Sequence, residues 1–124
     1  MKDKRPVNID FRTIRLPLPA ITSILHRISG AFIFVGIALL LYLLDTSLSS
    51  DAGFRLVGEL MDNLVVKLLT WTVVAGLLYH LVAGIKHLLM DMGIGETLSG
   101  SRTGAKLVIA VSAVLIVIAG VWLW

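Results

Sequence analysis

The chain has 124 residues, a formal net charge of +3 and no cysteine. Hydrophobic residues make up 57% of it and charged residues 15%, against roughly 45–50% and about 25% in soluble domains. The length suits one domain, residues 1–124. The lack of cysteine excludes disulfides, thiolate metal sites, iron–sulfur ligation and covalent c-type haem attachment within this chain.

The hydrophobic residues are concentrated in three segments that contain no charged residue. These segments are residues 28–44, 68–85 and 107–124, which are 17, 18 and 18 residues long. As helices they would each extend for about 26–27 Å, and one flanking turn brings each to the roughly 30 Å of a bilayer core. The sequence therefore predicts an all-α integral membrane protein with three transmembrane helices.

The predicted elements follow one another along a single membrane-anchor domain. Residues 1–18 form a polar N-terminal segment, and Pro19 suits the first position of a helix. We expect the three membrane helices at residues 19–44, 63–92 and 104–124.

The connections between these helices have signals of their own. Apolar residues recur at helical spacing in the first connection and predict a short amphipathic turn on the outer interface: Phe54, Val57, Met61 and Leu64. In the second connection, Gly93 and Gly95 are expected to terminate the preceding helix. Ser99–Thr103 is expected to form a polar link to the last helix.

The distribution of basic residues predicts the orientation. Residues 1–27 carry six Lys and Arg, residues 45–67 carry two, and residues 86–106 carry three. Basic segments stay in the cytoplasm during insertion. We therefore expect the N-terminus and second connection to be on the cytoplasmic side, and the first connection and C-terminus to be outside. The positive charge reflects this asymmetry and does not indicate nucleic-acid binding.

A first polar cluster lies near the start of the first membrane helix. Ser23, His26 and Arg27 are spaced i, i+3 and i+4, so their side chains are expected to share a face. Such a face suits an anionic carboxylate or a quinone carbonyl. The alternative is that Arg27 extends to a lipid phosphate and has no further role.

A second polar cluster surrounds His80, which lies inside the second uncharged segment. Gly76 and Gly84 stand four residues before and after it, which would leave room for a flat macrocycle whose iron His80 ligates. The alternative is close helix packing through the glycines, with His80 hydrogen-bonded to a neighbouring helix. A histidine at this depth needs a partner in either case.

The other histidines cannot complete a haem site with His80. His87 lies about 10 Å further along the same helix, and His26 is expected at the inner surface. A second axial ligand would have to come from another polypeptide. His87 could contact a haem propionate, relay protons near neutral pH, or simply face water at the interface.

The sequence resembles the cytochrome b subunit of bacterial succinate dehydrogenase. That subunit is the larger membrane anchor of complex II. The likeness covers nearly the whole chain. Its first signature is Arg5-Pro6-Val7-Asn8 followed by Ser23-x-x-His26-Arg27-x-Ser29-Gly30. Its second is His80-x-x-x-Gly84-Ile85-Lys86-His87-Leu88-x-Met90-Asp91-x-Gly93, with Lys86 where the family usually has arginine.

The resemblance implies roles for four residues, and it implies a bacterial inner membrane with the C-terminus in the periplasm. It implies that His80 is an axial ligand of haem b, with the opposite ligand supplied by a smaller anchor subunit. It further implies that Ser23 and Arg27 contact ubiquinone, and that His26 and Arg27 lie near the haem propionates, where His87 could also lie. The flavoprotein and iron–sulfur subunits would be separate chains on the cytoplasmic side.

The implied function is that of a membrane anchor and haem b subunit of succinate:ubiquinone oxidoreductase, in the tricarboxylic acid cycle and aerobic electron transport, with no catalysis by this chain alone. One alternative is a haem-free structural anchor of a related complex such as fumarate reductase. Another is a small transporter or channel subunit with a histidine relay. The segment from Leu107 onward argues against a transporter, because Ser112 is its only polar residue.

Overall fold

A computed structural model describes Arg12 and residues 14–124. Most of the predicted N-terminal segment, including the Arg5–Asn8 signature, lies outside these residues. The secondary structure of the described residues is all helical, as the sequence predicted, with four helices and no strand. They are α1 (Leu18–Ser49), α2 (Asp51–Asp62), α3 (Leu64–Asp91) and α4 (Leu98–Leu123).

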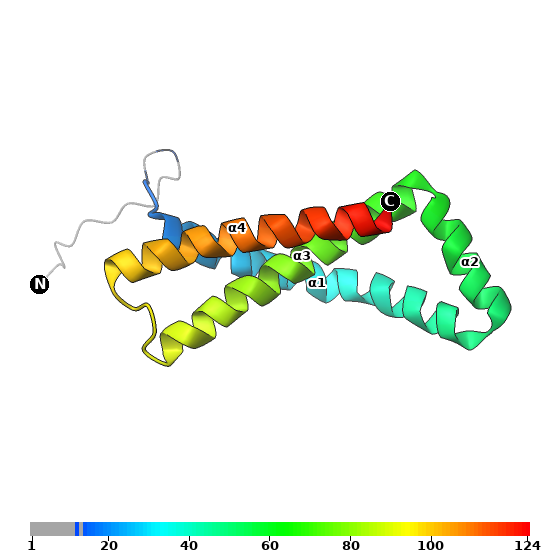
Figure 1. Cartoon of the computed structure of the whole chain (residues 1–124), viewed down its shortest axis with the longest axis horizontal. Helices are drawn as coiled ribbons and strands as arrows, with labels where there is room; N and C mark the ends of the chain where they lie inside the picture. Colours follow the sequence, from blue (N-terminus) through cyan, green and yellow to red (C-terminus); the bar gives the residue numbers. More distant parts are fainter. Residues whose placement is uncertain (1–11, 13) are drawn as a thin grey trace, which may run out of the picture.

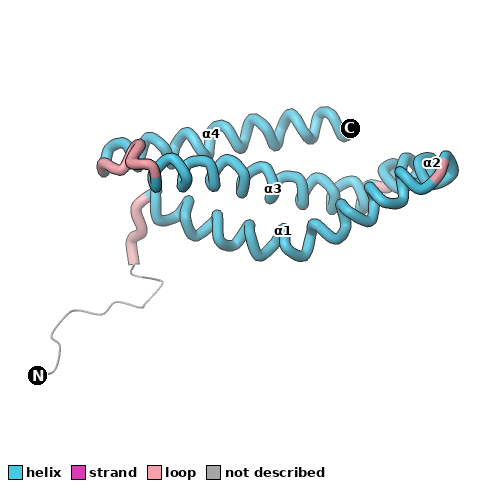
Figure 2. The backbone as a smooth tube through the Cα atoms, turned by 90° about the horizontal axis from the view of Figure 1, so that it is seen from below, coloured by secondary structure: helices cyan, strands magenta, loops and turns pink. Residues whose placement is uncertain are grey.

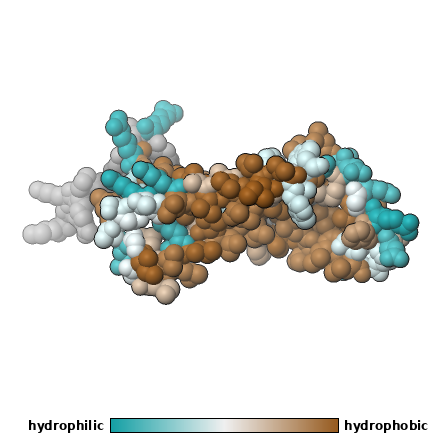
Figure 3. All heavy atoms as spheres, viewed as in Figure 1, coloured by the Kyte–Doolittle hydropathy of each residue, from teal (hydrophilic) through white to brown (hydrophobic). Residues whose placement is uncertain are grey.

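The three long helices α1, α3 and α4 run alongside one another, and α2 turns away at one end (Figures 1 and 2). The start of α1 and the α3–α4 connection lie at the opposite end from α2 and the C-terminus. Each long helix is long and apolar enough to cross a membrane. Figure 3 shows a hydrophobic middle with hydrophilic residues gathered at both ends. The predicted three-helix membrane fold is confirmed.

Two helix boundaries differ from those expected. Helix α1 continues to Ser49, five residues past Leu44, so Asp45 and the serines that follow it are helical beyond the apolar segment. Helix α4 begins at Leu98, so the polar link expected at Ser99–Thr103 is wrong. Thr97 caps this helix by accepting a hydrogen bond from the Gly100 N–H at 3.0 Å.

The end of α3 and the first connection follow the sequence signals more closely. Gly93 and Gly95 both have positive φ angles, 83° and 73°, and end α3 as predicted. The expected amphipathic turn is the 12-residue helix α2. Ser50 caps it by accepting from the Gly53 N–H at 2.9 Å, and Gly53 itself abuts the Thr46 carbonyl, where no side chain would fit.

Small residues let the long helices approach closely, as is usual in membrane bundles. A Cβ added to Gly36 of α1 would lie 2.9 Å from both Val73 methyl groups of α3. Ala83 of α3 and Ala105 of α4 are completely buried. The core is therefore thin, and most large apolar side chains face outward, as in a protein whose surroundings are hydrocarbon.

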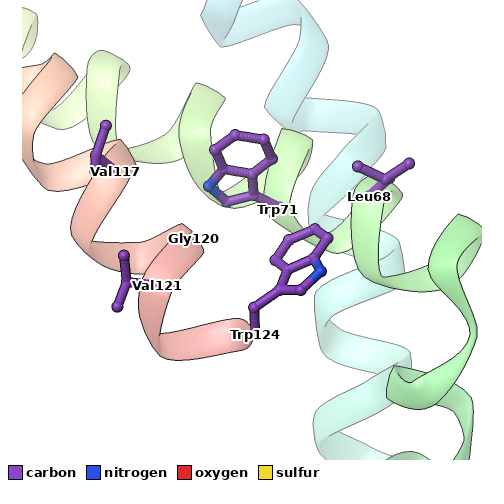
Figure 4. Close-up of a pocket in the computed structure, with 6 residues that line it drawn as sticks. All are labelled: Leu68, Trp71, Val117, Gly120, Val121 and Trp124. Atoms are coloured by element: carbon purple, nitrogen blue, oxygen red, sulfur yellow. The ribbon is translucent and has the colours of Figure 1, made fainter.

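Tryptophans hold α3 against α4 at the end near α2. The Trp71 indole N–H donates to the Ile116 carbonyl at 2.9 Å, and a Cβ added to Gly120 would lie only 3.1 Å from the Trp71 ring. The Trp124 ring meets Trp71 edge-on at 5.8 Å. Figure 4 shows both rings beside the open apolar groove between these helices.

Candidate functional site

Three histidines from two helices form a stack in the half of the bundle away from α2. His26 comes from α1, and His80 and His87 come from α3. The His26 ring lies between the other two, 4.1 Å from the His80 ring at an interplanar angle of 11° and 4.8 Å from the His87 ring at 20°. Stacked rings present their edges side by side, so these imidazoles do not converge on one ion. Accordingly, no described group of three or more His, Cys, Asp or Glu could hold a metal ion.

The ring of His80 is fixed by hydrogen bonds to α1. Its Nδ1 lies 3.1 Å from the His26 carbonyl oxygen and 3.1 Å from Ser29 Oγ. The Ser29 hydroxyl already donates to the same carbonyl at 2.8 Å. Because a carbonyl can only accept, we infer that Nδ1 carries the proton, and Nε2 of the neutral ring keeps its lone pair.

The other nitrogen of His80 is accessible. Nε2 makes no hydrogen bond to any described residue, and no buried side-chain nitrogen or oxygen of the described chain lacks a partner. Nε2 must therefore reach the surface. All three histidines line one groove of about 350 Å³, whose other walls are apolar and come from α3: Leu81, Gly84, Ile85 and Leu88. Such a ring, held through Nδ1 with Nε2 free, has the arrangement typical of a metal-binding histidine.

Ser23 pairs with the third histidine. His87 Nδ1 lies 2.8 Å from the Ala83 carbonyl of its own helix, which again places the proton on Nδ1. His87 Nε2 is then an acceptor, and it lies 3.4 Å from Ser23 Oγ, a long hydrogen bond. The hydroxyl hydrogen of Ser23 therefore points to His87 Nε2.

The remaining polar residues of the two clusters do not join this group. Arg27 is exposed and makes no hydrogen bond or ion pair with the described residues, so the expected convergence of Ser23, His26 and Arg27 on one point is only partly met. Lys86 lies against Gly104 of α4 instead of the histidine groove. Asp91 is exposed and forms no ion pair within the described chain.

The glycines around His80 serve helix packing. A Cβ on Gly76 would meet the Phe32 ring at 2.8 Å, and one on Gly84 would lie 3.4 Å from His26 Nε2. The space expected for a macrocycle is therefore occupied by side chains of α1. The room beside Nε2 comes from the open groove instead.

Sequence reasoning gave no role to three residues that shape the site. Ser29 bonds His80, as described above, and Gly30 lets its ring approach, since a Cβ there would lie 2.9 Å from His80 Cε1. These residues follow His26 by three and four positions, which was the available signal. Tyr79 donates to the carbonyl of fully buried Thr22 at 2.8 Å and ties α3 to α1 beside the stack.

The fold and site together define a multi-pass membrane subunit whose histidine site is built by two helices and open on one side. Residues 1–119 match the family of succinate dehydrogenase/fumarate reductase transmembrane subunits, and the chain belongs to that family. It is thus a membrane subunit of an oxidoreductase complex.

Individual relatives carry matching names. The chain is 42% identical to the succinate dehydrogenase cytochrome b556 subunit of Coxiella burnetii over 100% of both chains. It is 32% identical to the cytochrome b556 subunit of Paracoccus denitrificans, over 94% of this chain and 90% of the relative. It is 31% identical to the succinate dehydrogenase cytochrome b560 subunit of Marchantia polymorpha, over 93% of this chain and 88% of the relative.

The Tyr79 hydrogen bond yields a stability test. Tyr79→Phe should lower the free energy of unfolding by about 1 kcal/mol, the usual scale for one interhelical hydrogen bond in a membrane. Tyr42→Phe is the matched control, because Tyr42 is also on a long helix but is exposed and has no hydrogen-bond partner among the described residues. Detergent-driven unfolding of the purified protein measures both, and equal effects would contradict the assigned role.

Proposed function

We propose that this chain is the haem b and quinone-site anchor of a succinate:ubiquinone oxidoreductase. It would hold one side of a haem, contribute to the quinone site, and attach the soluble subunits to the membrane. Family membership supports the complex, and the free Nε2 of His80 is the observation that carries the haem assignment. The chain would carry out no catalysis by itself.

The residues present suit haem b. His80 offers one accessible nitrogen whose orientation is set by the His26 carbonyl and Ser29, and the groove beside it is apolar. His26 has two ring nitrogens without a hydrogen-bond partner among the described residues, so it can bind a propionate, with Arg27 supplying charge nearby. His87 is the third histidine at the groove edge. When bound, the haem would supply one-electron chemistry whose potential depends on ligation and burial.

The open histidine groove supports the proposal of a second anchor subunit. His80 would supply one nitrogen ligand, and because the His26 and His87 rings are stacked beside it, they do not converge with it on one ion. A helix of the partner subunit that covers the open side of the groove would supply a further ligand. The pair of anchor subunits would then enclose the haem that neither encloses alone.

The quinone assignment rests on Ser23 and Arg27. Both lie on the first three turns of α1, so they would be near the membrane surface from which electrons arrive. Arg27 would stabilise negative charge that develops on a quinone oxygen, which is favourable at low local dielectric. Ser23 can donate to a quinone carbonyl only when its hydrogen leaves His87, so His87 would act as a positioning residue for Ser23.

A haem-free structural anchor is the second candidate. Two observations favour it. The space beside Gly76 and Gly84 is filled by α1 side chains, and His80 already has interhelical hydrogen bonds. A transporter has less support, because the Ser112 hydroxyl is bonded to the Val108 carbonyl of its own helix and offers no polar path.

Replacing His80 separates these candidates. His80→Ala in the intact complex should abolish the haem b absorption band, because the sole ligand from this chain is lost. Co-purification of the soluble subunits and succinate oxidation with a soluble electron acceptor should persist, which shows that the complex still assembles. An unchanged haem spectrum would reject the ligand assignment, and a wild-type complex without haem absorption would favour the structural anchor.

Ser23 tests the quinone site. Ser23→Ala should lower succinate-dependent quinone reduction by a factor of about two to ten, as expected for one lost hydrogen bond. Reduction of a soluble acceptor should stay unchanged. Ser47→Ala is the control, because Ser47 is a serine of the same helix that bonds only its own helix near the α2 end. Equal loss of both activities would indicate misassembly and would count against a quinone contact.

The proposed orientation places the N-terminus and the α3–α4 connection in the cytoplasm of a bacterium, where the iron–sulfur and flavoprotein subunits would dock. The excess of basic residues at that end supports it. A reporter fused after Trp124 should then give its signal from outside the cytoplasm. A cytoplasmic signal from that fusion would reverse the orientation.

A further inference from the structure

A second groove, separate from the histidines, lies between the end of α3 and the first turns of α4. Its volume is about 350 Å³. Its walls combine a lysine, two hydroxyls and large apolar side chains: Lys86, Ser99, Thr103, Leu89, Ile94 and Leu107. It is located at the end of the bundle that carries the start of α1 (Figure 1), where Figure 3 shows hydrophilic residues.

Lys86 is the charged group of this groove. Its side chain lies along Gly104, where a Cβ would be 3.2 Å from Lys86 Cε. It makes no ion pair or hydrogen bond with the described residues, although Asp91 and Glu96 are at the same end of the bundle. The Lys86 residue is half-buried, and an ammonium without an anion is unfavourable at a membrane boundary. This position therefore suits an anion from outside the described chain.

The groove lies at the edge of the hydrocarbon layer. Lys86 immediately follows the uncharged segment of α3, and Lys106 immediately precedes the uncharged segment of α4. Both therefore mark the same edge of the hydrocarbon layer. An anion that reaches Lys86 would be at the level of the lipid phosphates.

The walls indicate that the ligand also has hydrocarbon. Leu89, Ile94 and Leu107 are 41%, 54% and 58% exposed beside the lysine. An acidic peptide would pair with the ammonium but leave these side chains uncovered, whereas a lipid would satisfy both. Exposed Arg102 on α4 adds positive charge, which attracts anionic lipid at a membrane surface.

We propose that this groove binds an anionic phospholipid. Its phosphate would contact the Lys86 ammonium and the hydroxyls of Ser99 and Thr103, and one acyl chain would run along Leu107 beside α4. The proposal is independent of the haem and quinone assignments, because none of these residues belongs to the histidine groove.

Lipid retention by the purified protein tests the site. The chain is purified from membranes with its bound subunits, exchanged into nanodiscs of phosphatidylcholine with a minority of phosphatidylglycerol, and released for native mass spectrometry. Wild type should retain one phosphatidylglycerol molecule, and Lys86→Gln should lower its occupancy at least tenfold. Lys106→Gln is the matched control at the same interface outside the groove, and it should retain the lipid.

A milder variant distinguishes the loss of a lipid contact from a packing defect. Thr103→Val keeps the side-chain shape but removes one hydroxyl, and it should weaken phosphatidylglycerol retention severalfold with unchanged haem absorption. Retention by Lys86→Gln equal to wild type, or equal loss in Lys106→Gln, would overturn the proposal. So would loss of a protein subunit from Lys86→Gln with lipid retained, because the groove would then dock a peptide.

Discussion

The hydrogen bond from His80 Nδ1 to the His26 carbonyl organises the rest of the site. It joins α3 to α1 in the middle of a membrane bundle, where an unsatisfied imidazole would be costly. It also determines which nitrogen remains available, because a protonated Nδ1 leaves Nε2 as the acceptor. Ser29 supports the same ring through Nδ1, and Gly30 permits the close approach. Two helices of one chain thereby fix the orientation of the His80 ring and leave its Nε2 accessible.

The small core of the bundle explains why the histidine groove is open on one side. Three helices of this length bury few side chains between them, and the core is made of small residues such as Ala83 and Ala105. A bundle this thin cannot enclose a large cofactor. Its polar groups instead lie along grooves that face outward, at His80 and at Lys86. In the proposed complex, partner helices would cover the groove at His80 and lipid would cover the groove at Lys86.

Much of the fold could be predicted from the sequence, because lipid allows no charge along the spans and the uncharged segments are unmistakable. The helix ends were less predictable, since a charge-free segment marks the hydrocarbon and not the helix. Helix α1 passes through Asp45 to Ser49, and α4 begins at Leu98 under the Thr97 cap. The spacing predicted that His26 and His80 matter, but not that their rings stack. Interhelical rotation, which spacing does not specify, also directs Arg27 outward and Lys86 toward α4.

A structure of the assembled complex by electron cryomicroscopy tests the central claim most directly. We expect His80 Nε2 to coordinate the haem iron while Nδ1 still lies within hydrogen-bond distance of the His26 carbonyl. A side chain of the partner anchor subunit should occupy the opposite axial position. A map in which His80 contacts only protein, with no haem beside it, would contradict the account and leave the chain as a structural anchor.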